Sequence, residues 1–259
     1  MHIHFESAIA EAASLLLKAP VVKSGYWQGI STEKHPEMAT FEVLNHSIKV
    51  FSTDFPREVL VPDIEPSLPW ADDHFEERVS RKPLNPPPSE EWWPYAPKGN
   101  ARFKNEAGIF SHTYPERYWP RLAGENLNRG IRFPYGDLDD LVALLLADPQ
   151  TRQAYLPVWF PEDLGAPINE RKPCSLGYQF IMRENKLHVV YGIRSCDFYR
   201  HLRNDIYLTV RLQHWVLDEL RNKDVNWNLV KPGSFTMHIT SLHLFRNDYY
   251  MGKGIDGHL

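Results

Sequence analysis

The sequence predicts an α+β fold. Helical patterns at 6–18 and 205–221 are interspersed with strand patterns at 40–51, 153–160 and 234–245. These segments do not follow the regular strand–helix–strand order of a doubly wound parallel sheet, which favours the α+β class. The length of 259 residues suits one large domain or two small ones.

The first half contains one helical pattern and one strand pattern. Residues 6–18 carry apolar side chains at helical spacing, and Pro20 ends this pattern. The alternation over 40–51 indicates a strand or a bent pair of strands. The segment 83–97 contains six prolines, which exclude a helix or a central strand. Its two tryptophans favour a loop packed against the body over a domain linker.

A helix and a strand open the second half. Asp137 is a suitable N-cap for a helix that extends through Leu146, with its leucines and valine on one face. Pro149 stops this helix, because proline cannot continue the hydrogen-bonded turns. Residues 153–160 then predict a strand.

The remaining elements are longer. Residues 176–184 and 187–194 resemble the two strands of a hairpin, joined around Asn185–Lys186. Residues 205–221 place apolar side chains on one helical face, which makes them available for the core. Residues 234–245 predict a final long strand.

Charge and composition argue against several classes of protein. The 33 acidic and 29 basic residues give a net charge of -4, so a broad nucleic-acid surface is not expected. No apolar run approaches the roughly 20 residues that cross a bilayer, and the first ten residues lack the pattern of a secretion signal. Cys174 and Cys196 form no CxxC pair and are too few for a disulfide scaffold. We therefore expect a soluble cytoplasmic protein with no membrane or nucleic-acid partner.

Common catalytic motifs are absent, but one stretch carries reactive residue types. No GxGxxG, P-loop, HExxH or GxSxG motif occurs, and the twelve histidines show no spacing typical of a metal site. Cys174 precedes one strand of the predicted hairpin, and Arg194 ends the other. Nearby positive charge favours a thiolate nucleophile, and an arginine also binds anionic substrates. A buried structural cysteine and a surface arginine explain the same pattern.

Several motifs in order resemble the thymidylate synthase and deoxycytidylate hydroxymethylase family. These are DPQTRQAYLPVW at 148–159, PCSLGYQF at 173–180, RSCD at 194–197, RNDIYLTVRLQHWVLDEL at 203–220 and TSLHLF at 240–245. The similarity is strong over roughly 110–250, and the helix is especially similar to the phage hydroxymethylase branch. The resemblance implies one domain over 1–259, a large mixed or antiparallel sheet with flanking helices, and a sheet-to-sheet homodimer.

The resemblance also implies roles for individual residues. Cys174 would add to C6 of a pyrimidine ring, so that C5 attacks a one-carbon electrophile. Arg194 and Ser195 would bind the 5′-phosphate, with Arg152 contributed by the partner subunit. The other positions implied are Asp197 at the pterin of a folate, His243 at the sugar hydroxyl and Tyr114 in the proton steps.

Asp205 stands where the family distinguishes its bases. Thymidylate synthases place an asparagine there, and their cytosine-specific relatives place an aspartate. Carboxylate oxygens accept from the 4-amino group of cytosine, and a protonated carboxyl donates to N3, whereas O4 of uracil would face a carboxylate. Asp205 also suits a helix N-cap, and the two roles are compatible.

The family's general acid is a glutamate in the N-terminal half. Glu77 is the best candidate, because the residues that follow it are similar to the hydroxymethylase segment. Glu76 is the alternative. An exposed helix glutamate with no catalytic role fits either position equally well.

Four features depart from the family pattern. Gln153 replaces a phosphate-binding arginine, Phe245 replaces a sugar-binding tyrosine, and His201 replaces a glycine near the pterin. Only 14 residues follow Phe245, where family members close a longer tail over the cofactor. A shorter lid favours access of water, and hence hydroxymethyl over methyl formation.

These features lead to one expected function and several alternatives. We expect C5 hydroxymethylation of CMP or dCMP, with 5,10-methylenetetrahydrofolate as the donor. The alternatives are methylation of dUMP, folate-independent chemistry at C5 or C6, and nucleotide binding without catalysis.

Overall fold

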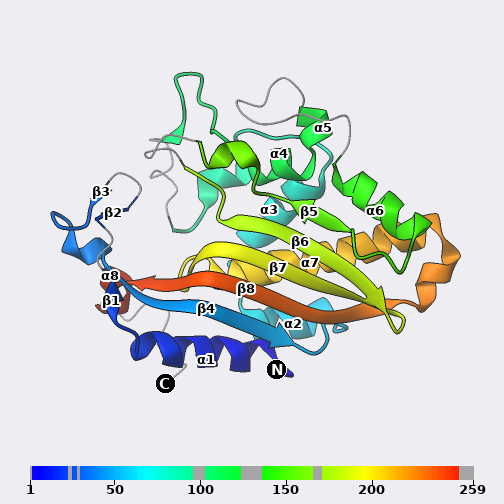
Figure 1. The fold of residues 1–259 in the computed structure, drawn as a ribbon, viewed down its shortest axis with the longest axis horizontal. Helices are drawn as coiled ribbons and strands as arrows, with labels where there is room; N and C mark the ends of the chain where they lie inside the picture. The colour runs from blue at the N-terminus through cyan, green and yellow to red at the C-terminus, as the bar shows by residue number, and fades with distance from the viewer. Residues whose placement is uncertain are drawn as a thin grey trace.

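The core of the molecule is a six-stranded mixed sheet (Figure 1). The computed structural model describes residues 2–22, 25–27, 30–95, 103–123, 136–165 and 171–250. The strand order is β1-β4-β8-β7-β6-β5, and β7 and β8 are parallel whereas the other neighbours are antiparallel. The strands are β1 (Val21–Val22), β4 (Thr40–Val50), β5 (Tyr155–Pro157), β6 (Ser175–Arg183), β7 (Lys186–Asp197) and β8 (Lys231–Phe245). The predicted α+β class is confirmed.

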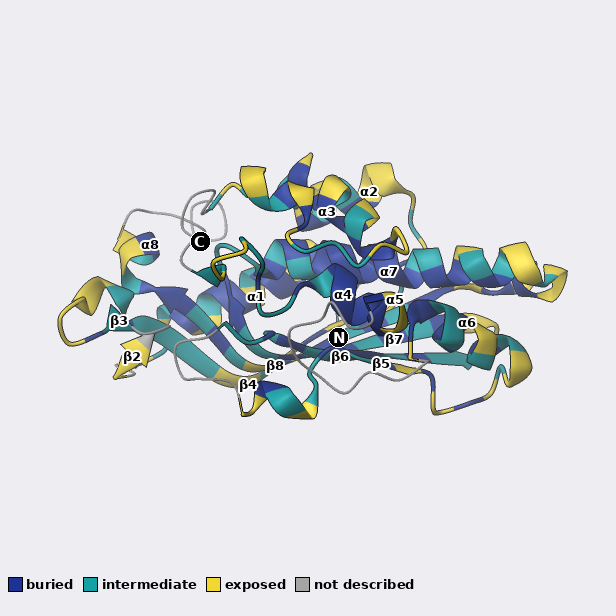
Figure 2. Ribbon diagram, turned by 90° about the horizontal axis from the view of Figure 1, so that it is seen from above, coloured by how far each residue is buried: buried dark blue, intermediate teal, exposed yellow. Residues whose placement is uncertain are grey.

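Helices α2, α3 and α7 lie on one side of this sheet (Figure 2). The longer helices are α1 (Phe5–Leu17), α2 (Arg57–Ile64), α3 (Trp70–Val79), α6 (Leu138–Ala147) and α7 (Leu202–Lys223). Short helices are α4 (Tyr114–Tyr118), α5 (Pro120–Ala123) and α8 (Arg246–Tyr250), and β2 (Tyr26–Trp27) pairs with β3 (Ile30–Ser31). Within the described residues, no helix is long and apolar enough to span a bilayer.

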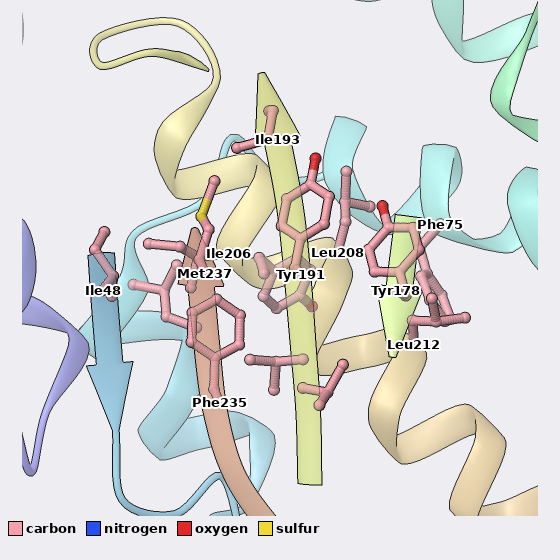
Figure 3. Packing of buried hydrophobic residues seen from close by; sticks show 14 of the residues in the cluster. Ile48, Phe75, Tyr178, Tyr191, Ile193, Ile206, Leu208, Leu212, Phe235 and Met237 are labelled. Atoms are coloured by element: carbon pink, nitrogen blue, oxygen red, sulfur yellow. The ribbon is translucent and has the colours of Figure 1, made fainter. Parts of the chain in front are cut away.

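The helix-covered face of the sheet is buried. Side chains that are directly opposite one another on β5, β6, β7, β8 and β4 form a fully buried row, comprising Leu156, Tyr178, Tyr191, Met237 and Ile48. Leu208 and Leu212 of α7 and Phe75 of α3 pack over this row (Figure 3). Because buried apolar area is the main stabilising term, this layer fixes α3 and α7 against the sheet.

The opposite face of the sheet is partly exposed. The neighbouring row across the same strands comprises Tyr155, Gln179, Val190, Thr236 and Lys49, none of them buried. Tyr155 at the β5 edge is 47 % exposed. Because side chains alternate in direction along each strand, one face of the sheet is covered by helices and the other is covered by no described helix.

Most predicted elements agree with the structure. The helices expected at 6–18 and from Asp137 to Leu146 are α1 and α6, and the strand at 40–51 is β4. The strand expected at 153–160 is wrong in length, since β5 ends at Pro157. Val158 and Trp159 both donate to the carbonyl oxygen of Leu176, so the ladder cannot continue.

Two boundaries also differ from expectation. The hairpin turn is Glu184–Asn185, with φ of 51° and 53°, one residue before the predicted position. Both residues have positive φ, as a two-residue I′ turn requires. Helix α7 begins at Leu202 with His201 as its N-cap, so the N-cap role of Asp205 is wrong. The Asp205 amide donates to His201 O at 2.8 Å inside the first turn.

Residues 83–95 pack against α3. Ser89 is fully buried in a short 3-10 helix over Pro88–Trp92, and the Trp70 indole donates to its carbonyl oxygen at 3.0 Å. The ring centroids of Trp93 and Trp70 are 6.3 Å apart. This segment therefore forms one wall above α3.

Candidate active site

One cavity brings together residues from helices α3, α4 and α7, from strands β7 and β8, and from the segment 83–95. Its volume is about 580 Å³, within the range typical of small-molecule sites. The residues that the sequence singled out and that line it are Tyr114, Cys174, Arg194, Ser195, Asp197, Asp205 and His243. His201 and Phe245, two of the departures from the family pattern, line it as well.

Cys174 lies immediately before β6, where β7 holds it in place. The Arg194 amide donates to Cys174 O at 2.9 Å. The Arg194 guanidinium donates to the carbonyl oxygens of Pro173, at 2.8 Å, and Lys172, at 3.2 Å. Burial raises the pKa of the Cys174 thiol, and the charges of Arg194 and Arg171 oppose that rise. The protonated thiol is therefore the resting form, and a thiolate formed there would lie beside two positive charges.

Asp205 is a half-buried carboxyl on the first turn of α7. Burial raises the pKa of Asp205 to about 7, although the charge of Arg78 lowers it. Among the described residues, its carboxylate has one hydrogen-bond partner, the Cys196 Sγ atom at 3.8 Å. Asp205 thus changes protonation near neutral pH and is available to a ligand.

Tyr114 opens α4, whose start is fixed by a capping box between Thr113 and Glu116. Its hydroxyl accepts from the Ser175 hydroxyl at 3.1 Å, next to Cys174 in the chain. Burial raises the pKa of Tyr114 to about 12. The phenol is therefore protonated at neutral pH and can donate a hydrogen bond in the cavity.

A charged cluster lies at the end of β7. Asp197 accepts from the backbone amides of Tyr199 and Arg200 at 3.0 and 3.1 Å. Burial raises the pKa of Asp197, opposed by His243 and Arg200. Arg200 also pairs with Asp248 at 2.8 Å. These contacts hold the turn between β7 and α7 that carries the cavity wall.

Three sequence candidates lie outside the lining. Glu77 accepts from the Ser89 amide at 2.6 Å behind the cavity wall. Glu76 is exposed and pairs with Arg211 at 2.8 Å. Arg152 is exposed before β5, and its carbonyl oxygen accepts from Gln179. The glutamate expected as general acid is therefore not brought to the cavity by this fold.

Several lining residues have no sequence motif that identifies them. Trp70, His74 and Arg78 are spaced four apart on α3, and all three line the cavity. A spacing of four places these side chains on one helical face. The charged residues of this helix, however, are also typical of a solvent-exposed surface. Arg171 and Arg200 belong to the same group of lining residues.

The cavity also offers faces for a flat heteroaromatic group such as a pterin. Trp70, Trp93, Phe103 and Phe110 line it, and His201 stacks on Trp93 with ring centroids 5.0 Å apart. Aromatic faces of this kind favour stacking with planar rings. Within the described part of the chain, no group of three or more His, Cys, Asp or Glu side chains could hold a metal ion.

The sequence matches a family model and several curated proteins. The family model described as thymidylate synthase matches residues 113–253. A deoxyuridylate hydroxymethyltransferase of Bacillus phage SP01 is 27 % identical over 156 residues, which cover 59 % of this chain and 38 % of that protein. A putative thymidylate synthase of Methanosarcina barkeri is 26 % identical over 145 residues, 52 % of this chain and 62 % of that protein.

A solved structure extends the likeness to the whole fold. Thermostable thymidylate synthase A from Bacillus subtilis superimposes with a TM-score of 0.64 at 15 % sequence identity. The superposition covers 95 % of this chain and 81 % of that chain. By contrast, the chain matches only 38 % and 62 % of the lengths of the two curated relatives above.

Proposed function

The chain belongs to the thymidylate synthase family, and from this premise we propose that it transfers a one-carbon group to C5 of the pyrimidine ring of a cytidine monophosphate. One observation carries the proposal: Cys174, Arg194 and Asp205 line the same cavity. A thiol, a cation for phosphate and a carboxyl for a base are the groups this chemistry requires.

The proposed reaction begins at Cys174. Its thiolate adds to C6 of the ring, and the C5=C6 electron pair moves so that C5 becomes nucleophilic. Burial raises the pKa of this thiol, and the charges of Arg194 and Arg171 oppose that rise and so favour the thiolate. Arg194 and Ser195 bind the 5′-phosphate, and Arg152 approaches it from a partner subunit.

Asp205 selects the base. Its oxygens accept from the 4-amino group of cytosine, and its ionised form repels the O4 atom of uracil. The first turn of α7 holds this side chain in the cavity, with its amide already bonded to His201. The phage relative is named for deoxyuridylate, so a uridine nucleotide is the second candidate substrate.

The proposed one-carbon donor is 5,10-methylenetetrahydrofolate, and it supplies the carbon when bound. Asp197 and the aromatic wall around Trp93 would hold its pterin. The Tyr114 hydroxyl, bonded to Ser175, moves protons at C5. His243 would contact the sugar. Hydroxymethyl formation is the proposed outcome, and methyl formation is the alternative.

Release of tritium from C5-labelled CMP, dCMP and dUMP, each with and without methylenetetrahydrofolate, tests the proposal. We expect folate-dependent release from a cytidine nucleotide, and a fall of about 1,000-fold or more in Cys174→Ser. The variant should bind nucleotide as tightly as the wild type, because the thiol adds only during the reaction. Tritium release without folate would exclude methylenetetrahydrofolate as the required donor. Release from none of the three nucleotides would favour a nucleotide-binding protein without catalytic activity.

A further inference from the structure

Arg78 is a buried arginine in the cavity wall. It is 4 % exposed and lines the cavity with Cys174 and Asp205. Within the described part of the chain, its guanidinium donates to His74 alone, and its buried Nε atom has no hydrogen-bond partner. Burying a cation without a paired anion is costly, and such a group typically serves a ligand.

A directed chain of hydrogen bonds holds this guanidinium. Arginine has no acceptor, so Arg78 Nη2 donates to His74 Nε2 at 3.0 Å. The His74 proton is then on Nδ1, which donates to the Ser89 hydroxyl at 2.9 Å. Ser89 in turn donates to the Glu77 carboxylate through both its hydroxyl and its amide. The chain ends on the Glu77 carboxylate, an anion that lies outside the cavity lining.

The guanidinium also lies close to the reacting groups. Its Cζ atom is 4.1 Å from the centroid of the Tyr114 ring. The Tyr114 hydroxyl is bonded to Ser175, the residue after Cys174. Arg78 and Asp205 line the same cavity and offer it a donor and an acceptor.

We propose that Arg78 is a catalytic residue that donates to N3 of the cytosine ring, and that Glu77 positions it through Ser89 and His74. When Cys174 adds, the S–C6 bond forms and the C5=C6 pair moves to C4–C5. The electron pair of the C4=N3 double bond then moves onto N3. The guanidinium stabilises the negative charge on N3 through a hydrogen bond and keeps its own proton. Asp205 is left to accept from the 4-amino group. This inference rests on the proposed function.

Calorimetric binding of CMP and of ribose 5-phosphate, which lacks the ring, tests the contact. We expect Arg78→Gln to weaken CMP binding about tenfold and to leave ribose 5-phosphate binding unchanged, with partial rescue in Arg78→Lys. At saturating CMP, tritium release should be at least about 100-fold slower in Arg78→Gln. Equal weakening of both ligands, or unchanged CMP binding, would overturn the ring contact.

Glu77→Gln tests the positioning role, with Glu219→Gln as the matched control. Glu219 holds another arginine, Arg81, at 2.9 Å outside the cavity lining. We expect Glu77→Gln to slow tritium release about tenfold when it is introduced into the wild-type protein. Introduced into the Arg78→Gln variant, it should cause no further slowing. Additive losses, or an equal loss in Glu219→Gln, would overturn the relay. A wild-type protein that binds no pyrimidine nucleotide would instead refute the proposed function, and the inference with it.

Discussion

At the scale of single residues, the base recognition proposed for Asp205 has a direct test. An asparagine amide donates to O4 of uracil and accepts from N3–H, whereas a carboxylate accepts from the 4-amino group of cytosine. We expect Asp205→Asn to shift the ratio of kcat/KM for CMP over UMP by about 100-fold toward UMP. Steady-state assays with both nucleotides measure this ratio of kcat/KM values. An unchanged ratio would mean that Asp205 does not contact the base.

The pH dependence of base choice follows from the same carboxyl. Burial raises the pKa of Asp205 to about 7, so it is protonated below that pH and can donate to O4 of uracil. Above it, the ionised carboxylate would accept from the cytosine amino group and repel O4. We expect the CMP-to-UMP ratio of kcat/KM to rise about tenfold from pH 6 to pH 8. Asp205→Asn should abolish that slope, and a slope that persists in the variant would assign it to another group.

At the scale of elements, Gly177 lets β6 pass the edge strand closely. A Cβ atom at Gly177 would lie 2.6 Å from Leu156 O and would collide with the Tyr155 ring. We expect Gly177→Ala to lower the free energy of unfolding by about 1–3 kcal/mol. Gly192→Ala on β7 is the control, because its Cβ would have no neighbour closer than 3.6 Å. Urea denaturation of both variants measures the difference, and equal losses would contradict the argument.

The sequence predicts elements better than it predicts side-chain direction. The strand and helix patterns have local causes, so α1, β4 and α6 were predictable. The start of α7 was not, because His201 is not a typical N-cap residue. Seven cavity residues were predictable because their motifs resemble a known family. The direction of Arg78 depends on Ser89, which only tertiary packing brings to Glu77 and His74.

At the scale of the whole molecule, the sheet has a face that the described helices leave partly exposed. Tyr155, Val190 and Thr236 share that face, and Arg152 precedes the β5 edge. A second copy packed there would bury this surface through a two-fold, self-complementary interface. The family resemblance implies that in such a dimer Arg152 of one copy reaches the cavity of the other. We therefore expect a homodimer whose two sites each require both chains.

Subunit complementation tests this arrangement. Arg152→Ala should raise the KM for the nucleotide about 10- to 100-fold, because it removes a charge-assisted phosphate contact, and Cys174→Ser should be inactive. In a mixed dimer, one site combines both substitutions, and the other keeps an intact Cys174 and Arg152. Co-expression of the two chains in equal amounts should therefore recover about one quarter of wild-type activity at low nucleotide concentration. If Arg152 served the cavity of its own chain, no site in the mixture would be intact, and mixing would recover nothing.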